Sequence, residues 1–269
     1  MRERIRKMRE FFVTEKGQRA FRQPAAEPEI LARGFAAQGL PDTERSARRL
    51  IWVLEQERPA LFEGERIAFT RTVPVIPEIF TEEEMEELKK TRWIHEKGDV
   101  CNINVDYSML MNQGLIPKKA ELEKIRAGFE RDGRQEKARY LQLQIDILDA
   151  VLDLVGRYRE QAYKEGNLTV ARTLERVPAY APKGLLEALQ MLRILHYTMW
   201  CGRNYHNTLG RFDQYMYPWF IRERQAGAQE EDLLELLEEY GVIEIARTGI
   251  AGLQLGEKYL SLDGEREKT

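Results

Sequence analysis

The segment from Asn204 to Trp219 carries the residues whose types and spacing are best suited to chemistry. It reads Asn-Tyr-His-Asn-Thr-Leu-Gly-Arg-Phe-Asp-Gln-Tyr-Met-Tyr-Pro-Trp. Arg211 and Asp213 are two residues apart, so they would share a face on a strand and diverge on a helix. Because apolar residues surround them, we expect a partly buried ion pair, with binding of a substrate carboxylate as the alternative. If the pair is buried, removal of one partner should strongly destabilise the chain.

Residues ahead of this pair could contact a ligand. His206 could transfer a proton near neutral pH or contact a substrate, or it could be a hydrogen-bonded structural histidine. Thr208 supplies a hydroxyl group that can donate and accept. The aromatic residues that follow favour roles in the core or in subunit contacts over direct stacking on a substrate: Tyr215, Tyr217, Trp219 and Phe220.

A second polar group lies about one hundred residues earlier. Cys101, Asn102 and Asn104 precede a helix whose start is marked by Asp106. Asparagine side chains both donate and accept hydrogen bonds, which suits a hydroxyl or carbonyl substrate. Turn formation and helix capping explain the same residues equally well. Cys101 is also consistent with an ordinary small buried residue.

Helical periodicity dominates the elements that must position these groups. The residues from Thr81 to Glu84 form a capping box. Gly128 and Gly133 predict a break within the longest helical pattern, and Gly241 predicts the end of the last one. The predicted helices cover residues 43–54, 117–163, 183–200 and 230–240, with a short acidic helix opening at Thr81.

Candidate strands are few. Residues Arg66–Arg71 alternate in polarity and are followed by Pro74 and Pro77, which predicts a short strand. The apolar run Leu195–Trp200 is consistent with either a buried strand or the end of a helix, and periodicity does not distinguish them. The proline-rich stretch is the best candidate for an internal sub-boundary, near residues 74–80.

Composition excludes several classes of protein. The 269 residues are 43% hydrophobic, and 42 basic residues against 45 acidic ones give a formal net charge of −3. This balance gives no general electrostatic case for binding nucleic acid. No apolar stretch approaches the ~20 residues that span a bilayer, and no apolar signal core follows the N-terminus. With two cysteines and scattered histidines (95, 196 and 206), we expect a cytoplasmic protein without a disulfide framework or a metal site.

The run from Gly210 to Pro218 resembles a signature of the glycyl radical enzymes, the family that contains pyruvate formate-lyase. Two further stretches are similar to that family in the same order. Residues 177–190, with His196 beyond them, resemble the segment that precedes the signature, and residues 94–115 resemble the loop and helix that approach the substrate cavity. The resemblance covers roughly residues 40–260.

This resemblance implies an α-rich α/β fold, the N-terminal helical portion of the ten-stranded α/β barrel of glycyl radical enzymes. Residues 1–269 would be an incomplete pyruvate formate-lyase domain. The reaction would be a radical cleavage, elimination or acyl transfer on a small polar metabolite. The substrate-binding candidates are Cys101, Asn102, Asn104, His206, Thr208, Arg211 and Asp213.

Family members also need a cysteine within Gly-Cys-x-Glu and a radical-carrying glycine within a pattern like Arg-Val-x-Gly-Tyr. Neither pattern occurs in these 269 residues. Arg176–Tyr180 copies the spacing of the second pattern, but Ala179 occupies the glycine position. We therefore expect no radical-carrying residue and no directly bound cofactor here, and no activity of this chain alone. The glycyl radical would lie on a C-terminal part and would be installed by a radical S-adenosylmethionine activase.

The expected partners are this activating enzyme, a separate C-terminal half, or further copies of the chain. An incomplete domain should also expose apolar surface, with residues 195–200 and 215–220 as the candidates. Two other interpretations stay open. One is a non-catalytic helical paralogue that acts as a binding or scaffold protein. The other is an uncharacterised helical enzyme using His206 and Asp213.

Overall fold

The computed structural model describes residues 3–14, 17, 19–91, 104–204 and 207–248, and for residues 242–248 the backbone alone. Helices make up most of this part of the chain. They are α1 (Glu3–Phe12), α3 (Ala32–Ala37), α4 (Asp42–Gln56), α5 (Glu82–Thr91), α6 (Tyr107–Met111), α7 (Leu115–Arg131), α8 (Gln135–Lys164), α9 (Leu168–Leu174), α10 (Leu185–Cys201), α11 (Phe212–Gln225) and α12 (Glu230–Thr248).

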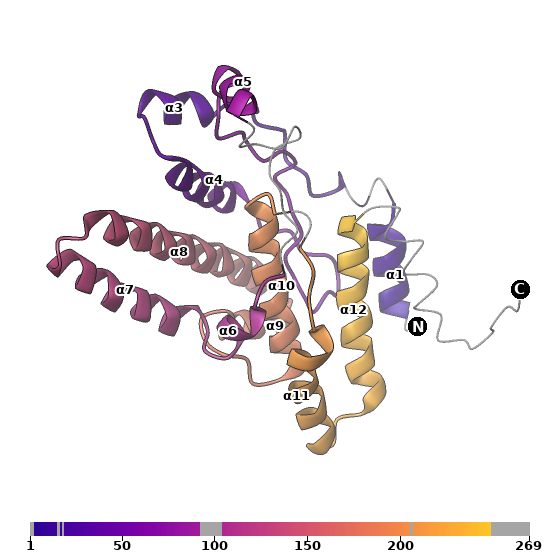
Figure 1. Ribbon diagram of the computed structural model, residues 1–269. Helices are drawn as coiled ribbons and strands as arrows, with labels where there is room; N and C mark the ends of the chain where they lie inside the picture. The colour runs from indigo at the N-terminus through magenta and orange to yellow at the C-terminus, as the bar shows by residue number, and fades with distance from the viewer. Residues whose placement is uncertain (1–2, 15–16, 18, 92–103, 205–206, 249–269) are drawn as a thin grey trace, which may run out of the picture.

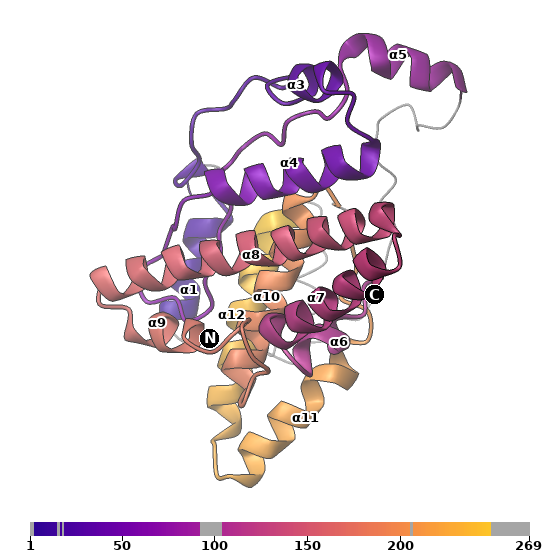
Figure 2. The same cartoon turned by 90° about the vertical axis from the view of Figure 1, so that its left-hand side faces the viewer.

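The helices are arranged around α10 (Figures 1 and 2). Helices α7 and α8 form an antiparallel hairpin, and α4 packs along α8. Helices α1 and α12, from opposite ends of the described chain, lie side by side. Helix α10 contacts α4, α6, α9, α11 and α12. It is therefore the element on which the others meet.

Leu195–Trp200 is helical, which decides between the two conformations that the sequence left open. Twelve of the 17 residues of α10 are buried and none is exposed, as expected of a helix that is surrounded by other elements. Leu195 and Tyr197 are buried within the chain, so the expectation of an exposed apolar surface is wrong for them. None of the helices in the described residues is both long and apolar enough to cross a membrane.

The predicted strand at Arg66–Arg71 is wrong. The segment is not part of a β-sheet in the described part of the chain, although Ile67 is fully buried. Buried backbone groups must still find hydrogen-bond partners. The carboxylate of Glu239, on α12, accepts hydrogen bonds from the backbone N–H groups of Arg66 and Ile67, at 2.5 and 3.1 Å.

Helix side chains also form hydrogen bonds with the backbone of the next three residues, 68 to 70. The amide of Gln190 accepts from the N–H of Ala68 at 2.8 Å and donates to its carbonyl at 3.3 Å, much as a neighbouring strand would. The Arg193 guanidinium donates to the carbonyl of Phe69. The Tyr158 hydroxyl donates to the carbonyl of Thr70 at 3.0 Å. The segment is irregular, with a φ of 93° at Phe69, and its backbone groups are paired with side chains.

Local signals predicted the helix ends with mixed success. The capping box is confirmed, because Thr81 Oγ1 accepts from the N–H of Glu84 at 3.3 Å and the Glu84 carboxylate accepts from the N–H of Thr81 at 3.0 Å. The break between α7 and α8 falls at Gly133, which has a φ of 72°. The predicted end at Gly241 is wrong, since α12 continues through it. A single glycine costs a helix about 1 kcal/mol, which tertiary packing readily offsets.

Candidate functional site

The structure brings together residues from both polar groups that the sequence singled out. Asn104 and Thr208 form a parallel β-bridge, although about one hundred residues separate them. The Thr208 hydroxyl donates to Oδ1 of Asn104 at 3.2 Å. Of the candidate substrate-binding residues in the described part of the chain, Asn104 and Arg211 line the pocket described next. Thr208 contacts Asn104 without lining that pocket, and Asp213 does not line it either.

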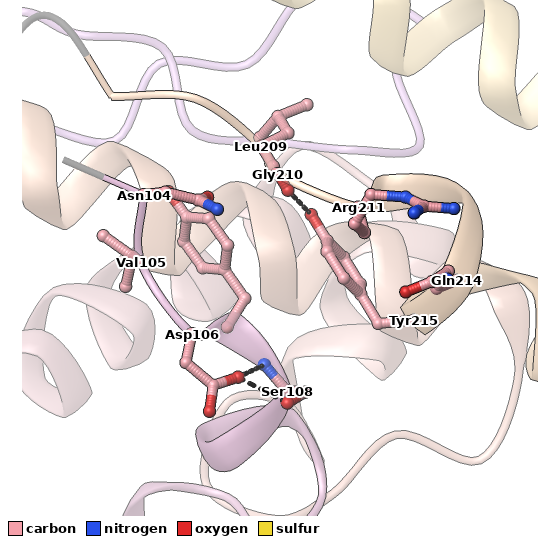
Figure 3. A pocket seen from close by; sticks show the side chains of 10 residues that line it. Asn104, Val105, Asp106, Ser108, Leu209, Gly210, Arg211, Gln214 and Tyr215 are labelled. Atoms are coloured by element: carbon pink, nitrogen blue, oxygen red, sulfur yellow. Dashed lines mark hydrogen bonds between the residues drawn. The ribbon is translucent and has the colours of Figure 1, made fainter. Parts of the chain in front are cut away.

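A pocket of about 430 Å³ opens beside this bridge (Figure 3). One wall is the stretch that leads into α6, and the other is the stretch that leads into α11. Its lining residues are Asn104, Val105, Asp106, Tyr107, Ser108, Leu209, Gly210, Arg211, Gln214 and Tyr215. Most of these side chains carry an amide, hydroxyl, carboxylate or guanidinium group, so the pocket suits a small polar ligand.

Gly210 allows the two walls to approach each other. Its φ is 60°, in the left-handed region, and a Cβ atom added there would lie 2.5 Å from Oδ1 of Asn104. Figure 3 shows the two residues facing each other. A glycine is required because any side chain would both strain the backbone and push Asn104 away.

The first wall is held by a helix cap and by a buried hydrogen bond. Oδ1 of Asp106 accepts from the N–H of Ser108 at 3.1 Å and from its hydroxyl group. The Ser108 hydroxyl lowers the pKa of Asp106, so this carboxylate is ionised. The hydroxyl of Tyr107 lies 2.6 Å from Nδ1 of His196 on α10. His196 is thus a buried, hydrogen-bonded residue of the core.

The second wall presents a neutral phenol. The Tyr215 hydroxyl donates to the carbonyl of Leu209 at 2.7 Å (Figure 3). Burial, and then the neighbouring Tyr107, raise the pKa of Tyr215 well above its ordinary value. The phenol therefore remains protonated and acts as a hydrogen-bonding group, since it cannot serve as a base near neutral pH.

Arg211 and Asp213 pair with each other, but the expectation of burial is wrong. Nε and Nη2 of Arg211 donate to Oδ1 and Oδ2 of Asp213, at 3.2 and 2.9 Å, and each side chain is 68% exposed. The Arg211 guanidinium holds the pKa of Asp213 below its ordinary value. The segment begins helix α11 rather than a strand, and an acid in the first turn is favourable because it faces the positive end of the helix dipole.

We expect Asp213→Ala to melt like the parent chain. Both charges are hydrated, so loss of one partner leaves no buried charge without compensation. Paired thermal unfolding of the parent and the variant tests this expectation. A large drop in the thermal midpoint would restore the buried-pair interpretation.

The aromatic residues after this pair divide between core and surface. Trp219 is 9% exposed and packs in the core, as predicted, whereas Tyr217 is 60% exposed. The remaining candidates Cys101, Asn102 and His206 lie outside the described residues, as does His95. In the described residues, no three His, Cys, Asp or Glu side chains are grouped so that they could hold a metal ion.

Of the ten lining residues, the sequence proposed only Asn104 and Arg211 as substrate contacts. It named Asp106 and Tyr215 in other roles, and it missed the polar side chains of Tyr107, Ser108 and Gln214. The Asp-x-Ser spacing at residues 106–108 is a capping signal that could have indicated Ser108. The other two have no comparable local signal, because their place in the pocket depends on how α6 and α11 pack.

Both walls of the pocket lie in a region that matches one known protein family. The sequence model of a family described as pyruvate formate lyase-like matches residues 76–244, which is more than half of the chain and includes both walls. The chain belongs to the pyruvate formate-lyase-like glycyl radical enzymes. A curated relative is (2S)-3-sulfopropanediol dehydratase from Klebsiella oxytoca, 26% identical over 171 residues, which cover 57% of this chain and 20% of the relative.

Solved structures of glycyl radical enzymes share the fold. A structure described under 1,2-propanediol dehydration in Roseburia inulinivorans aligns with a TM-score of 0.72 at 19% identity, over 92% of this chain and 40% of that one. The glycerol-bound form of the B12-independent glycerol dehydratase from Clostridium butyricum aligns with a TM-score of 0.68 at 17% identity, over 90% and 39%.

The fold prediction is therefore confirmed. The chain is rich in helices and corresponds to the N-terminal part of the glycyl radical enzyme barrel. It spans about 40% of the length of these structures and a fifth of the curated relative.

Proposed function

We propose that this chain provides the N-terminal wall of the substrate cavity in a glycyl radical lyase of the dehydratase type. The observation that supports this most is the Asn104–Thr208 bridge at the edge of the pocket, directly before the Gly-Arg-Phe-Asp-Gln segment. The substrate class is a small hydroxylated metabolite. The relatives and similar structures named above are described as dehydratases or by dehydration, which favours elimination over acyl transfer.

The pocket residues suit the recognition of a hydroxylated substrate. Asn104 offers an amide that donates and accepts, and the Tyr215 hydroxyl, which donates to Leu209, can accept. Asp106, being ionised, can accept a hydrogen bond from a substrate hydroxyl group. These side chains would hold a small diol in one orientation, and orientation of the reacting carbon accounts for a large part of catalysis in a pocket of this kind.

The radical chemistry is proposed to reside on further polypeptide. A glycyl radical, installed by a radical S-adenosylmethionine activase, would supply hydrogen abstraction through a cysteine of that part. We propose that the described chain binds and orients the substrate and assembles with the part that carries the cysteine and the glycine. The parallel bridge supports this assembly, because parallel β-pairs are normally buried within larger sheets.

The test compares the chain alone with the chain assembled with the polypeptide that carries the cysteine and the glycine. The chain alone, incubated anaerobically with an activating enzyme, S-adenosylmethionine and a reductant, should give no doublet in electron paramagnetic resonance. Co-expressed with a polypeptide that carries Gly-Cys-x-Glu and Arg-Val-x-Gly-Tyr, it should give the doublet and convert 1,2-propanediol or glycerol into an aldehyde. A doublet from the chain alone would contradict the proposal.

A matched pair of variants tests the pocket. In the assembled enzyme, Thr208→Val should lower kcat/KM by about tenfold, because it removes the hydrogen bond, worth roughly 1 kcal/mol, that holds the Asn104 side chain at the edge of the pocket. Thr43→Val, on α4 and outside this pocket, serves as the control and should leave kcat/KM unchanged. Equal activity of the two variants would remove Thr208 from the site.

A further inference from the structure

A second pocket lies on another part of the chain and shares no lining residue with the first. Its volume is about 430 Å³, and its walls are the stretches 20–24 and 58–61, with Thr72 between them. Arg22 and Arg58 both line it. We propose that this pocket binds the phosphate group of a small phosphate monoester. The inference does not depend on the radical chemistry proposed above.

Thr72 holds both walls in fixed positions. Its hydroxyl donates to the buried carboxylate of Glu57 at 2.6 Å and accepts from Gln23 Nε2 at 2.8 Å and from the N–H of Arg58 at 3.0 Å. One donor and two lone pairs are thereby all used. The Thr72 carbonyl also accepts from the N–H of Gln23 at 2.8 Å. The two segments that carry the arginines are thus tied to one buried residue.

The two guanidinium groups are exposed and available. In the described part of the chain, the Arg22 and Arg58 side chains have no hydrogen bond or ion pair to a protein group. Other arginines of the chain are paired with acids, as Arg45 is with Glu84 at 2.8 Å. A guanidinium presents a planar fork of donors that matches phosphate oxygens. Because the backbone at both positions is already held, binding has only the two arginine side chains to order.

The two guanidinium groups outnumber the single lining carboxylate, that of Glu165, so the pocket favours an anion, and the number of donors favours a phosphate monoester over a carboxylate. A phosphate monoester carries about −1.5 to −2 charges near pH 7 and three terminal oxygens, which suits two forks. A carboxylate, with one charge, would satisfy one of them. The volume matches a small metabolite.

The remaining walls indicate what the phosphate would be attached to. Phe21, Pro59 and Leu61 supply an apolar side against which a short carbon chain can pack. Glu165 also lines the pocket, and its carboxylate accepts from Gln161 Nε2 at 2.6 Å. This acid weakens the binding of inorganic phosphate and can accept a hydrogen bond from a hydroxyl or ammonium group of the ligand. The ligand class is therefore a phosphate monoester that also carries such a donor.

Isothermal titration calorimetry with the purified chain tests this site, with inorganic phosphate and glycerol 3-phosphate as probes and acetate and glycerol as comparisons. We expect saturable binding of both phosphates, tighter for glycerol 3-phosphate. Arg22→Gln and Arg58→Gln should each weaken it by about tenfold, because each variant removes a positive charge and a fork of charge-assisted hydrogen bonds. Arg222→Gln, an exposed arginine on α11, makes the same change in net charge and should have no effect.

Four results would overturn the proposal. They are no saturable binding of either phosphate, acetate binding as tightly as phosphate, glycerol binding as tightly as glycerol 3-phosphate, and equal weakening in Arg222→Gln. Thermal unfolding of each variant establishes that the compared proteins are folded. Since exposed guanidinium groups contribute little to stability, all three variants should melt like the parent.

Discussion

Replacing Gly114 by alanine should destabilise the chain by at least about 3 kcal/mol, or prevent it from folding. Gly114 precedes α7 with a φ of 89°. A Cβ atom there would lie 2.4 Å from Cα of Tyr180 and 2.6 Å from the carbonyl oxygen of Ala179. Both atoms belong to the backbone, so no side chain can rotate away. The loop would have to move as a whole.

That movement would break contacts that hold the two segments together. The N–H groups of Leu115 and Ile116 donate to the carbonyls of Pro178 and Ala179, at 2.8 and 3.0 Å. Buried backbone groups left without partners add their own cost to the collision. The stretch that follows the pocket-lining helix α6 would therefore lose its attachment, and the pocket should be affected together with stability.

Two other glycines serve as matched controls in urea unfolding. Gly133 also has a positive φ, 72°, but no atom lies within 4 Å of a Cβ added there. Gly133→Ala should therefore lower the free energy of unfolding by only about 1 kcal/mol. Gly128→Ala lies within α7 in open space and should stabilise the chain by roughly 0.5–1 kcal/mol. If Gly114→Ala were no worse than Gly133→Ala, the close packing of the two segments would be refuted.

Glu239→Gln should have the next largest effect and lower the free energy of unfolding by about 3 kcal/mol. This is the lower end of the range for breaking a buried ion pair. Glu239 is fully buried on α12. Its Oε2 accepts from Arg4 of α1 at 2.7 Å and from Arg66 at 3.0 Å. A glutamine oxygen can keep the hydrogen bonds from the backbone of residues 66 and 67. Its NH₂ group, however, would face two guanidinium groups, so donors would oppose donors.

Arg4 and Arg66 can regain some hydration, since each side chain is 25% exposed. The loss of unfolding free energy should therefore lie at the lower end of the range for a broken buried ion pair. The neighbouring Glu238→Gln is the control, because this side chain is only partly buried and should change stability by less than about 0.5 kcal/mol. Hydrogen exchange provides a second measurement, in which α1 should lose protection in Glu239→Gln. Equal unfolding free energies for the two variants would contradict the network.

Both predictions concern residues whose roles are not visible in their sequence neighbourhood. Nothing beside Gly114 in the chain indicates that residues 179–180 lie against it. Glu239 lies among the acids of α12, most of which are solvated, and pattern alone does not distinguish it from Glu238. The partners in each case are 65 or more residues away. Their effect therefore enters through packing.

The sequence by itself determined the elements whose hydrogen bonds are local. The helix at residues 43–54, the capping box at Thr81 and the break at Gly133 were all predictable, because helical hydrogen bonds and caps join residues three to four positions apart. The Gly-Arg-Phe-Asp-Gln run likewise predicted the family, and with it two polar stretches that line one cavity.

The tertiary structure alone decided which polar groups are buried and what satisfies them. Arg66–Arg71 alternates like a strand, yet helix side chains meet its backbone groups, because hydrogen bonding requires a partner and not a particular kind of partner. Arg211 and Asp213 lie between apolar residues in the sequence and are nonetheless hydrated, since burial depends on elements brought over them from elsewhere in the chain. The local sequence indicates which polar groups need hydrogen-bond partners. The packing of distant helices determines which partners they find.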